Sequence, residues 1–166
     1  RAAPPKGRSV SAVSTCLWFD TQAEDAARLY TSLLPNSEIR HVERYPEGVR
    51  DREPGSVMVV DFTLEGVPYQ ALNGGPDFAF TPAASIVVTT DTDAETDRLW
   101  DALTDGGQES MCGWLVDRYG LSWQIVPRAY LALMASLDDD GRARAASALM
   151  KQRKIDVDAL RAAAEG

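Results

Sequence analysis

Proton-transfer and nucleophilic side chains are scarce in this sequence, which holds one histidine and two cysteines. His41 lies in a strand-like segment between charged residues, so we expect an exposed face residue and not a general base. Cys16 and Cys112 are far apart and form no Cys-x-x-Cys motif, so we expect reduced packing thiols and not a redox pair or a zinc site. A Ser-His-Asp triad is therefore not predicted.

Two glutamines are more informative, because each follows an aromatic residue in an otherwise apolar strand-like run. The first, Gln70, lies in residues 56–72, where Glu65-Gly66 predicts a two-residue hairpin turn. Pairing across that turn places Asp61 opposite Gln70. Because strand side chains alternate, the aromatic residue is expected to face a core and the glutamine to face away from it.

The second glutamine, Gln124, lies in a predicted hairpin over residues 111–127. A turn at residues 117–120 is predicted by its Asp and Gly, and we expect Val116 to face Leu121 across it. The residues then divide between two faces of the hairpin. The predicted core face holds Trp114, Val116, Leu121, Trp123 and Ile125. The predicted opposite face holds Leu115, Ser122, Gln124 and Val126.

An internal repeat predicts the domain organisation. The segments DTQAEDAARLYTSL and DTDAETDRLWDAL, which begin at Asp20 and Asp91, share Asp-Thr-x-Ala-Glu followed by Arg-Leu-aromatic. Each follows a strand-like run, and each is followed by strands that end in aromatic-Gln. In the first segment, we expect Asp20-Thr21 to cap a helix. The sequence therefore predicts two copies of one strand-helix-strands unit.

The predicted fold class is α+β, with two βαβββ modules, the second abbreviated, that form a curved sheet around a cleft, and with helices at the C-terminal end. Four parts of the chain are expected. They are a flexible tail at 1–12, the first module at 13–80, the second module at 81–127 and a C-terminal helical extension at 128–166.

Charge and hydropathy exclude some partners. The formal net charge is −8 and the basic residues are dispersed, so no nucleic-acid partner is expected. No apolar run approaches the roughly 20 residues that span a bilayer, so no membrane partner is expected. The first dozen residues lack the apolar centre of a secretory signal, and together with the two dispersed cysteines this predicts a cytoplasmic protein.

The sequence resembles the vicinal oxygen chelate superfamily of glyoxalases, bleomycin-resistance proteins and dioxygenases. Within it, the chain is similar to PhnB-like proteins that carry the "3-demethylubiquinone-9 3-methyltransferase" domain name. The resemblance is carried by CLWFDTQAEDAARLYTSLLPNS, ALNGGPDFAF, CGWLVDRYGLSWQIVP and MKQRKIDVDAL, and it extends from Thr15 to Leu160. It implies the fold described above and the pairing of two copies into a homodimer.

The resemblance also implies where ligands would bind. In metal-dependent members, ligands come from the first, fourth, fifth and last strands, and these positions fall near Thr15, Gln70, Ser85 and Gln124. That set lacks imidazole and carboxylate groups, so we expect no metal and no cofactor. Asp61 is the carboxylate that would enter such a site, although a solvated strand residue is expected there.

We therefore expect a metal-independent, PhnB-like protein that binds a small molecule in a cleft. The residues expected to line it are Thr15, Asp61, Gln70, Leu72, Ser85, Leu115 and Gln124. Three alternatives stay open: a metal-dependent isomerase, lyase or dioxygenase of the superfamily, a methyltransferase as the domain name suggests, and an interaction scaffold whose cleft is filled. The Gly-rich turn of a conventional S-adenosylmethionine fold is not found in the sequence.

Overall fold

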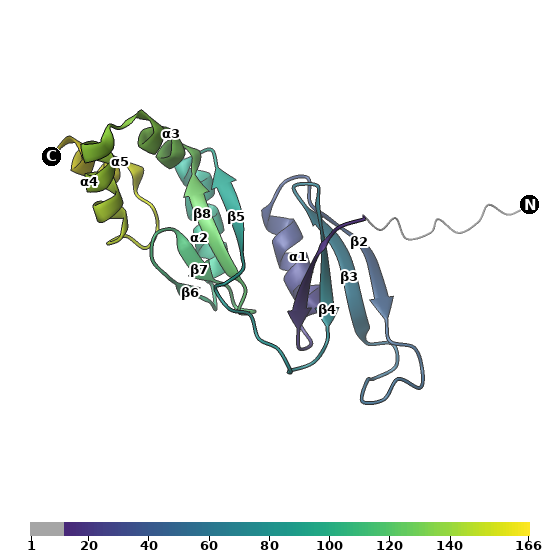
Figure 1. Cartoon of the computed structure of the whole chain (residues 1–166). Helices are drawn as coiled ribbons and strands as arrows, with labels where there is room; N and C mark the ends of the chain where they lie inside the picture. The colour runs from purple at the N-terminus through teal and green to yellow at the C-terminus, as the bar shows by residue number, and fades with distance from the viewer. Residues whose placement is uncertain (1–11) are drawn as a thin grey trace, which may run out of the picture. The chain divides into compact units, whose positions relative to one another are not determined.

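The computed structural model describes residues 12–166, which form two compact units that meet in sequence at Ala79 and Phe80 (Figure 1). Each unit contains one four-stranded mixed sheet and the helix that follows its first strand. The predicted flexible tail, 1–12, lies outside the described residues except for Ala12. The repeat in the sequence is thus matched by a repeat of the strand-helix-strands unit.

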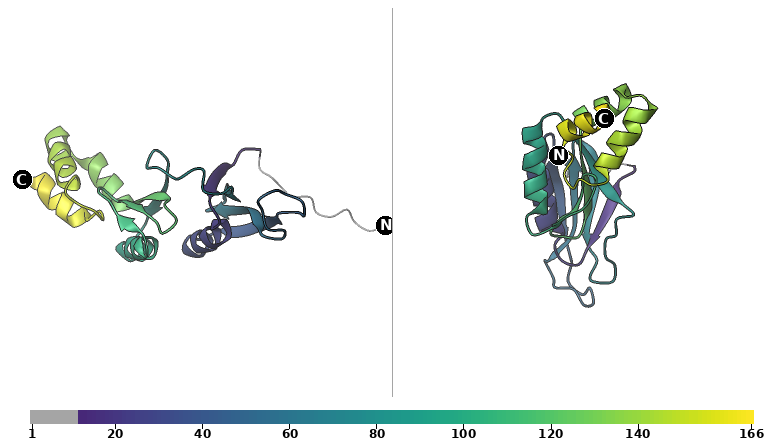
Figure 2. Two further views of the ribbon diagram at one scale, coloured as in Figure 1. Left: turned by 90° about the horizontal axis from the view of Figure 1, so that it is seen from below. Right: turned by 90° about the vertical axis from the view of Figure 1, so that its left-hand side faces the viewer.

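The first unit has the strand order β1-β4-β3-β2, in which β1 runs parallel to β4 and the other neighbours are antiparallel. Helix α1 packs on one face of this sheet, as Figure 2 shows. Its Ala26, Ala27 and Tyr30 are fully buried, as expected for residues between a helix and a sheet. The elements are β1 (Thr15–Phe19), α1 (Ala23–Leu33), β2 (Glu38–Arg44), β3 (Val57–Leu64) and β4 (Val67–Asn73).

Helix α1 is not capped as the sequence predicted. Its N-cap residue is Gln22, which makes no capping side-chain hydrogen bond. The backbone N–H of Ala23 instead donates to Oδ1 of Asn73, at 2.8 Å, and Nδ2 of Asn73 donates to the carbonyl oxygen of Val57, at 3.0 Å. The predicted cap at Asp20-Thr21 is therefore wrong. The acceptor is supplied by Asn73, which lies 50 positions beyond Ala23 in the sequence.

The second unit repeats this architecture with shorter strands, in the order β5-β8-β7-β6. Helix α2 contributes the buried Leu99, Trp100 and Leu103 to its core and covers one face of the sheet (Figure 2). The predicted abbreviation is confirmed, since β6 has 2 residues and β7 has 3. The elements are β5 (Ser85–Thr90), α2 (Asp93–Thr104), β6 (Gln108–Glu109), β7 (Trp114–Val116) and β8 (Ser122–Pro127).

Three helices follow β8 and gather at one end of the second unit (Figure 1). They have a small core of their own, formed by the buried Leu133, Ile155 and Leu160. The expected α+β class with C-terminal helices is confirmed. None of the helices described is long and apolar enough to cross a membrane. These last elements are α3 (Arg128–Ser136), α4 (Asp139–Leu149) and α5 (Val157–Glu165).

The two glutamine-bearing hairpins differ in how well their registers were predicted. In the first, Leu64 pairs with Val67 and Asp61 with Gln70, as expected. Its turn residues Glu65 and Gly66 both have positive φ, at 50° and 77°, which suits a two-residue hairpin loop. The first hairpin is therefore confirmed residue by residue.

The predicted register of the second hairpin is wrong by one residue. Val116 pairs with Ser122, so its expected partner Leu121 belongs to the turn. The physical reason is Asp117, whose backbone N–H donates to the carbonyl oxygen of Leu121 at 2.9 Å. Its Oδ1 also accepts from the backbone N–H groups of Tyr119 and Leu121, at 2.8 and 3.1 Å. These hydrogen bonds close a longer turn than was predicted. Each β7 residue therefore lies on the opposite face of the sheet from the one expected.

Candidate functional site

The face of the first sheet that points away from α1 is called here the first open face, and it includes Cys16, Trp18, Asp61, Gln70 and Leu72. The register defines it, because Cys16 lies opposite Gln70 and Trp18 lies opposite Leu72. Gln70 and Leu72 are half-buried there, and so is Asp61. The register thus brings three of the expected site residues to one surface.

Thr15 is not part of this surface. It lies opposite Tyr69, whose ring stacks on Phe62 at 5.5 Å between ring centroids. Phe62 belongs to the core beneath α1 and also contacts Tyr30 of that helix. The expected place of Thr15 on the same surface as Gln70 is therefore wrong, since the strand alternates and Cys16 lies opposite Gln70.

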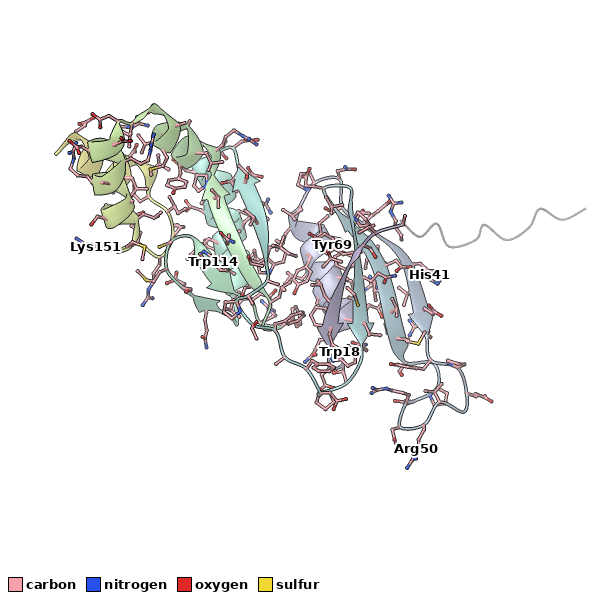
Figure 3. The ribbon with its side chains drawn as sticks, viewed as in Figure 1. Trp18, His41, Arg50, Tyr69, Trp114 and Lys151 are labelled. Atoms are coloured by element: carbon pink, nitrogen blue, oxygen red, sulfur yellow. The ribbon has the colours of Figure 1, made fainter. Side chains whose placement is uncertain are left out.

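A row of polar side chains crosses the first open face from strand to strand: His41, Asp61, Gln70 and Cys16. Nε2 of Gln70 donates to Oδ1 of Asp61, at 2.9 Å. Asp61 is thus half-buried and hydrogen-bonded, and not the fully solvated residue that was expected. His41 is exposed, as expected, and Figure 3 labels it on β2. Its position opposite Asp61 depends on a β-bulge that the sequence did not reveal.

A second, apolar row lies next to the polar one and consists of Trp18, Leu72 and Val59. The indole N–H of Trp18 donates to the carbonyl oxygen of Gly75, at 2.9 Å, and its ring meets Phe78 edge-on with centroids 5.0 Å apart. This aromatic residue is labelled in Figure 3. The first open face therefore combines a polar row with an apolar row.

The second sheet has an equivalent surface on the side away from α2, the second open face, which includes Ser85, Val87, Trp114 and Gln124. Nε2 of Gln124 and Oγ of Ser85 form a hydrogen bond of 2.9 Å. Trp114 pairs with Gln124 across the β7–β8 ladder, so its half-buried ring shares this face (Figure 3). Sequence reasoning missed Trp114 because of the register error.

Leu115 lies on the other side of the second sheet, and its assignment to the site was wrong. It pairs with Trp123 and is fully buried, with 0% of its surface exposed. Trp123 and Ile125 are buried beside it at 1% exposure each, so this is the core face beneath α2. Leu115 therefore contributes to packing.

The donor groups at the expected ligand positions do not fit a transition metal. Gln70, Ser85 and Gln124 offer neutral amide and hydroxyl oxygens, which are weak ligands compared with imidazole, thiolate or carboxylate. Across residues 12–166, no group of three or more His, Cys, Asp or Glu side chains is arranged to hold a metal ion. The amide and hydroxyl groups of these residues can instead orient a ligand through hydrogen bonds.

Two surface hollows lie away from the expected site residues. One, of about 400 Å³, is lined by residues of the first unit that include Asp20, Glu24, Tyr45 and Arg52. The other, of about 330 Å³, lies between the start of α2 and the residues before α5, and Lys154 is one of its lining residues. Both linings are rich in carboxylates and differ from the mixed apolar and amide character of the open faces.

The thiol of Cys16 is expected to be a poor nucleophile at neutral pH. Desolvation by its neighbours raises the pKa of Cys16 above the ordinary thiol value, although the residue is exposed. Since the thiolate is the reactive form, alkylation by iodoacetamide in a Cys112→Ser background should rise with pH at a higher midpoint than in the urea-unfolded chain. A lower midpoint than in the unfolded chain would show an activating positive group and contradict this environment.

The comparisons with known proteins agree with this architecture. The family model described as 3-demethylubiquinone-9 3-methyltransferase matches residues 11–126. The chain belongs to this family. A PhnB protein from Bacillus cereus is 36% identical to it, with a TM-score of 0.65, and the match covers 70% of this chain and 99% of that one. The expected PhnB-like relationship is therefore confirmed.

A more distant structure shows the same fold. A protein from Pseudomonas aeruginosa is 19% identical, with a TM-score of 0.59, and the match covers 71% of this chain and 98% of that protein. No match was found among curated proteins. The family match ends at residue 126, so α3, α4 and α5 lie beyond the shared part.

Proposed function

We propose that this family member is a cytoplasmic, homodimeric protein that binds a small molecule on its open faces without a transition metal. The supporting observation is that each sheet holds a glutamine on the face away from its helix, and each glutamine is hydrogen-bonded to a neighbouring polar side chain. Side chains that are held in place in this way can orient a ligand at little entropic cost. The sequence also predicts that both faces line one cleft, and this stays a prediction.

The composition of the faces supports a binding role. Ligand sites are mainly apolar, with a few polar groups that fix orientation. Trp18 and Leu72 supply the apolar surface of the first face beside Gln70, and Trp114 and Val87 do so beside Gln124. A sheet face with no binding role and exposed to water would be expected to carry fewer half-buried aromatic rings.

Alanine at either glutamine should weaken binding without unfolding the protein. For Gln124→Ala and Gln70→Ala, we expect about fivefold weaker binding of a copurifying small molecule, since one lost hydrogen bond corresponds to roughly 1 kcal/mol. Mass spectrometry of protein purified without chelators would quantify the bound molecule, and the melting temperature should stay within a few degrees.

Gln108→Ala is the matched control, because Gln108 is exposed on the short edge strand β6. It should retain the ligand at the wild-type level. Retention by all three variants at the wild-type level would contradict the proposed site. A stoichiometric metal ion in the same preparation would favour the metal-dependent alternative.

Transfer of a methyl group is the second candidate function, and the family description favours it. Such a reaction requires a methyl donor, and S-adenosylmethionine is the common one. Binding of S-adenosylmethionine to the purified protein, measured by calorimetry and reduced by Gln124→Ala, would support this reading. Absence of binding would leave the small-molecule-binding role as the better account.

A further inference from the structure

We propose that the second open face selects uncharged ligands that join an aromatic ring to a hydrogen-bonding group such as a carboxamide. This inference rests on the proposed function and specifies the class of ligand that one of its two surfaces takes. It follows from the row of Val87, Gln124 and Trp114, which crosses the face on three neighbouring strands.

The second open face is built from uncharged side chains. Besides the row and Ser85, the β5–β8 and β7–β8 ladders place on it Thr89, Val116, Ser122 and Val126. Every side chain that these two ladders bring to the face is therefore uncharged. A ligand with an ionised group would lose part of its hydration there without meeting an opposite charge. This disfavours anions and cations alike.

Gln124 can bond to a neutral polar group in either orientation of its amide. Its Nε2 lies 2.9 Å from Oγ of Ser85, and its side chain makes no other hydrogen bond to residues 12–166. Because a hydroxyl group can donate or accept, the reversed amide would also satisfy this bond. In both orientations the amide keeps at least one N–H donor and one lone pair on Oε1. Gln124 therefore complements a group that both donates and accepts, as a carboxamide does.

The aromatic part of the ligand is assigned from Trp114. Its half-buried ring lies beside Gln124 on β7 (Figure 3), and the exposed Val87 lies on the other side of Gln124, on β5. Neighbouring strands are about 5 Å apart, so the two flanking residues start about that far from Gln124. A benzene ring spans a similar distance. A ring that packs against the indole of Trp114 therefore leaves a carboxamide substituent within reach of Gln124.

The first open face does not carry the same inference. There the polar row includes His41 and Asp61, which are ionisable. The residue that pairs with Gln70 on β3 is Asp61, whereas the residues that pair with Gln124 are apolar or aromatic. The preference for uncharged ligands is therefore assigned to the second unit alone.

Three probes of nearly the same shape would test the inference: benzamide, benzoate and benzamidine. At neutral pH they are uncharged, anionic and cationic. Their binding to the full chain would be followed by NMR through the side-chain NH₂ signals of Gln124 and the indole N–H signal of Trp114, assigned with Trp114→Phe. A high salt concentration would screen the net charge of −8. We expect benzamide to bind at least about fivefold more tightly than either charged probe.

A lysine on this face should change the order of affinities. In Val87→Lys the ammonium group would lie beside Gln124, so benzoate should bind at least as tightly as benzamide. Thr89→Lys provides a second variant in case Val87→Lys folds poorly, because Thr89 is exposed on the same strand and face, and it should shift the order in the same direction.

Ala94→Lys is the matched control. It adds the same charge at an exposed position of α2, which covers the opposite face of the sheet. This variant should keep the preference for benzamide. The two-dimensional spectrum of each variant would establish its fold.

The outcomes separate this inference from the proposed function. Probes that shift the Gln124 and Trp114 signals with equal affinities, or with a charged probe bound most tightly, would overturn the preference for uncharged ligands and leave the binding surface standing. A benzamide preference that both Val87→Lys and Thr89→Lys keep would also overturn it, because the uncharged face would then not be its cause. Signals that none of the probes shifts would count against the second open face as a binding surface, and the preference would fall with it.

Discussion

Replacement of Asp117 by alanine should destabilise the protein by about 3 kcal/mol, because a buried carboxylate there accepts several hydrogen bonds. Asp117 is 3% exposed. Its Oδ2 accepts from the indole N–H of Trp123, at 2.8 Å, and its Oδ1 accepts from the backbone of Tyr119 and Leu121. Alanine would leave the buried indole N–H of Trp123 without this acceptor. Urea denaturation of both proteins would measure the change in the free energy of unfolding.

Asp139→Ala is a suitable control for this change. Asp139 is fully exposed and forms a 3.4 Å ion pair with Arg142 at the start of α4. Such surface pairs contribute little, so we expect a change of less than about 1 kcal/mol. If Asp117→Ala cost no more than Asp139→Ala, the account of the β7–β8 turn, and of the register it imposes, would be wrong.

Gly74→Ala should cost about 2 kcal/mol and alter the fluorescence of Trp18. A Cβ atom at position 74 would lie 2.2 Å from Cζ2 of Trp18, well inside van der Waals contact. The indole would have to move and would lose its hydrogen bond to the carbonyl oxygen of Gly75. Thermal unfolding and the tryptophan emission spectrum would detect both effects.

A double-mutant cycle would isolate the clash between Gly74 and Trp18. In a Trp18→Ala background the indole is absent, so Gly74→Ala should cost less than about 0.5 kcal/mol more. An equal cost in both backgrounds would show that the backbone, and not the indole, requires glycine at this position. It would then remove the support for a fixed Trp18 ring on the first open face.

The contrast between the two hairpins shows which registers a sequence can specify. Glu65-Gly66 forms a two-residue turn, and such a turn sets the pairing of the strands on either side, so Asp61 and Gln70 were placed correctly. The second turn is longer, and its length depends on hydrogen bonds from the Asp117 side chain to later backbone groups. Sequence patterns do not specify the number of residues in such a turn. A register slip of one residue moves every side chain of a strand to the opposite face of the sheet. Leu115 and Trp114 therefore exchanged faces.

Features that depend on distant parts of the chain were harder to predict. The cap of α1 comes from Asn73, and the row that joins His41 to Cys16 depends on the register of all four strands of the first sheet. The repeat itself was visible, because both helices carry similar apolar positions after similar first turns. Elements, their order and the pairing across a two-residue turn could thus be derived from local pattern, while contacts between elements far apart in the sequence could not.

A crystal structure of the protein purified directly from cells, with no ligand added, tests the central claim most directly. We predict density for a small molecule on an open face, in contact with the side chain of Gln70 or Gln124. Density against Leu115 on the α2 side, or in the hollow beside Tyr45 and Arg52, with both glutamines untouched, would contradict the claim.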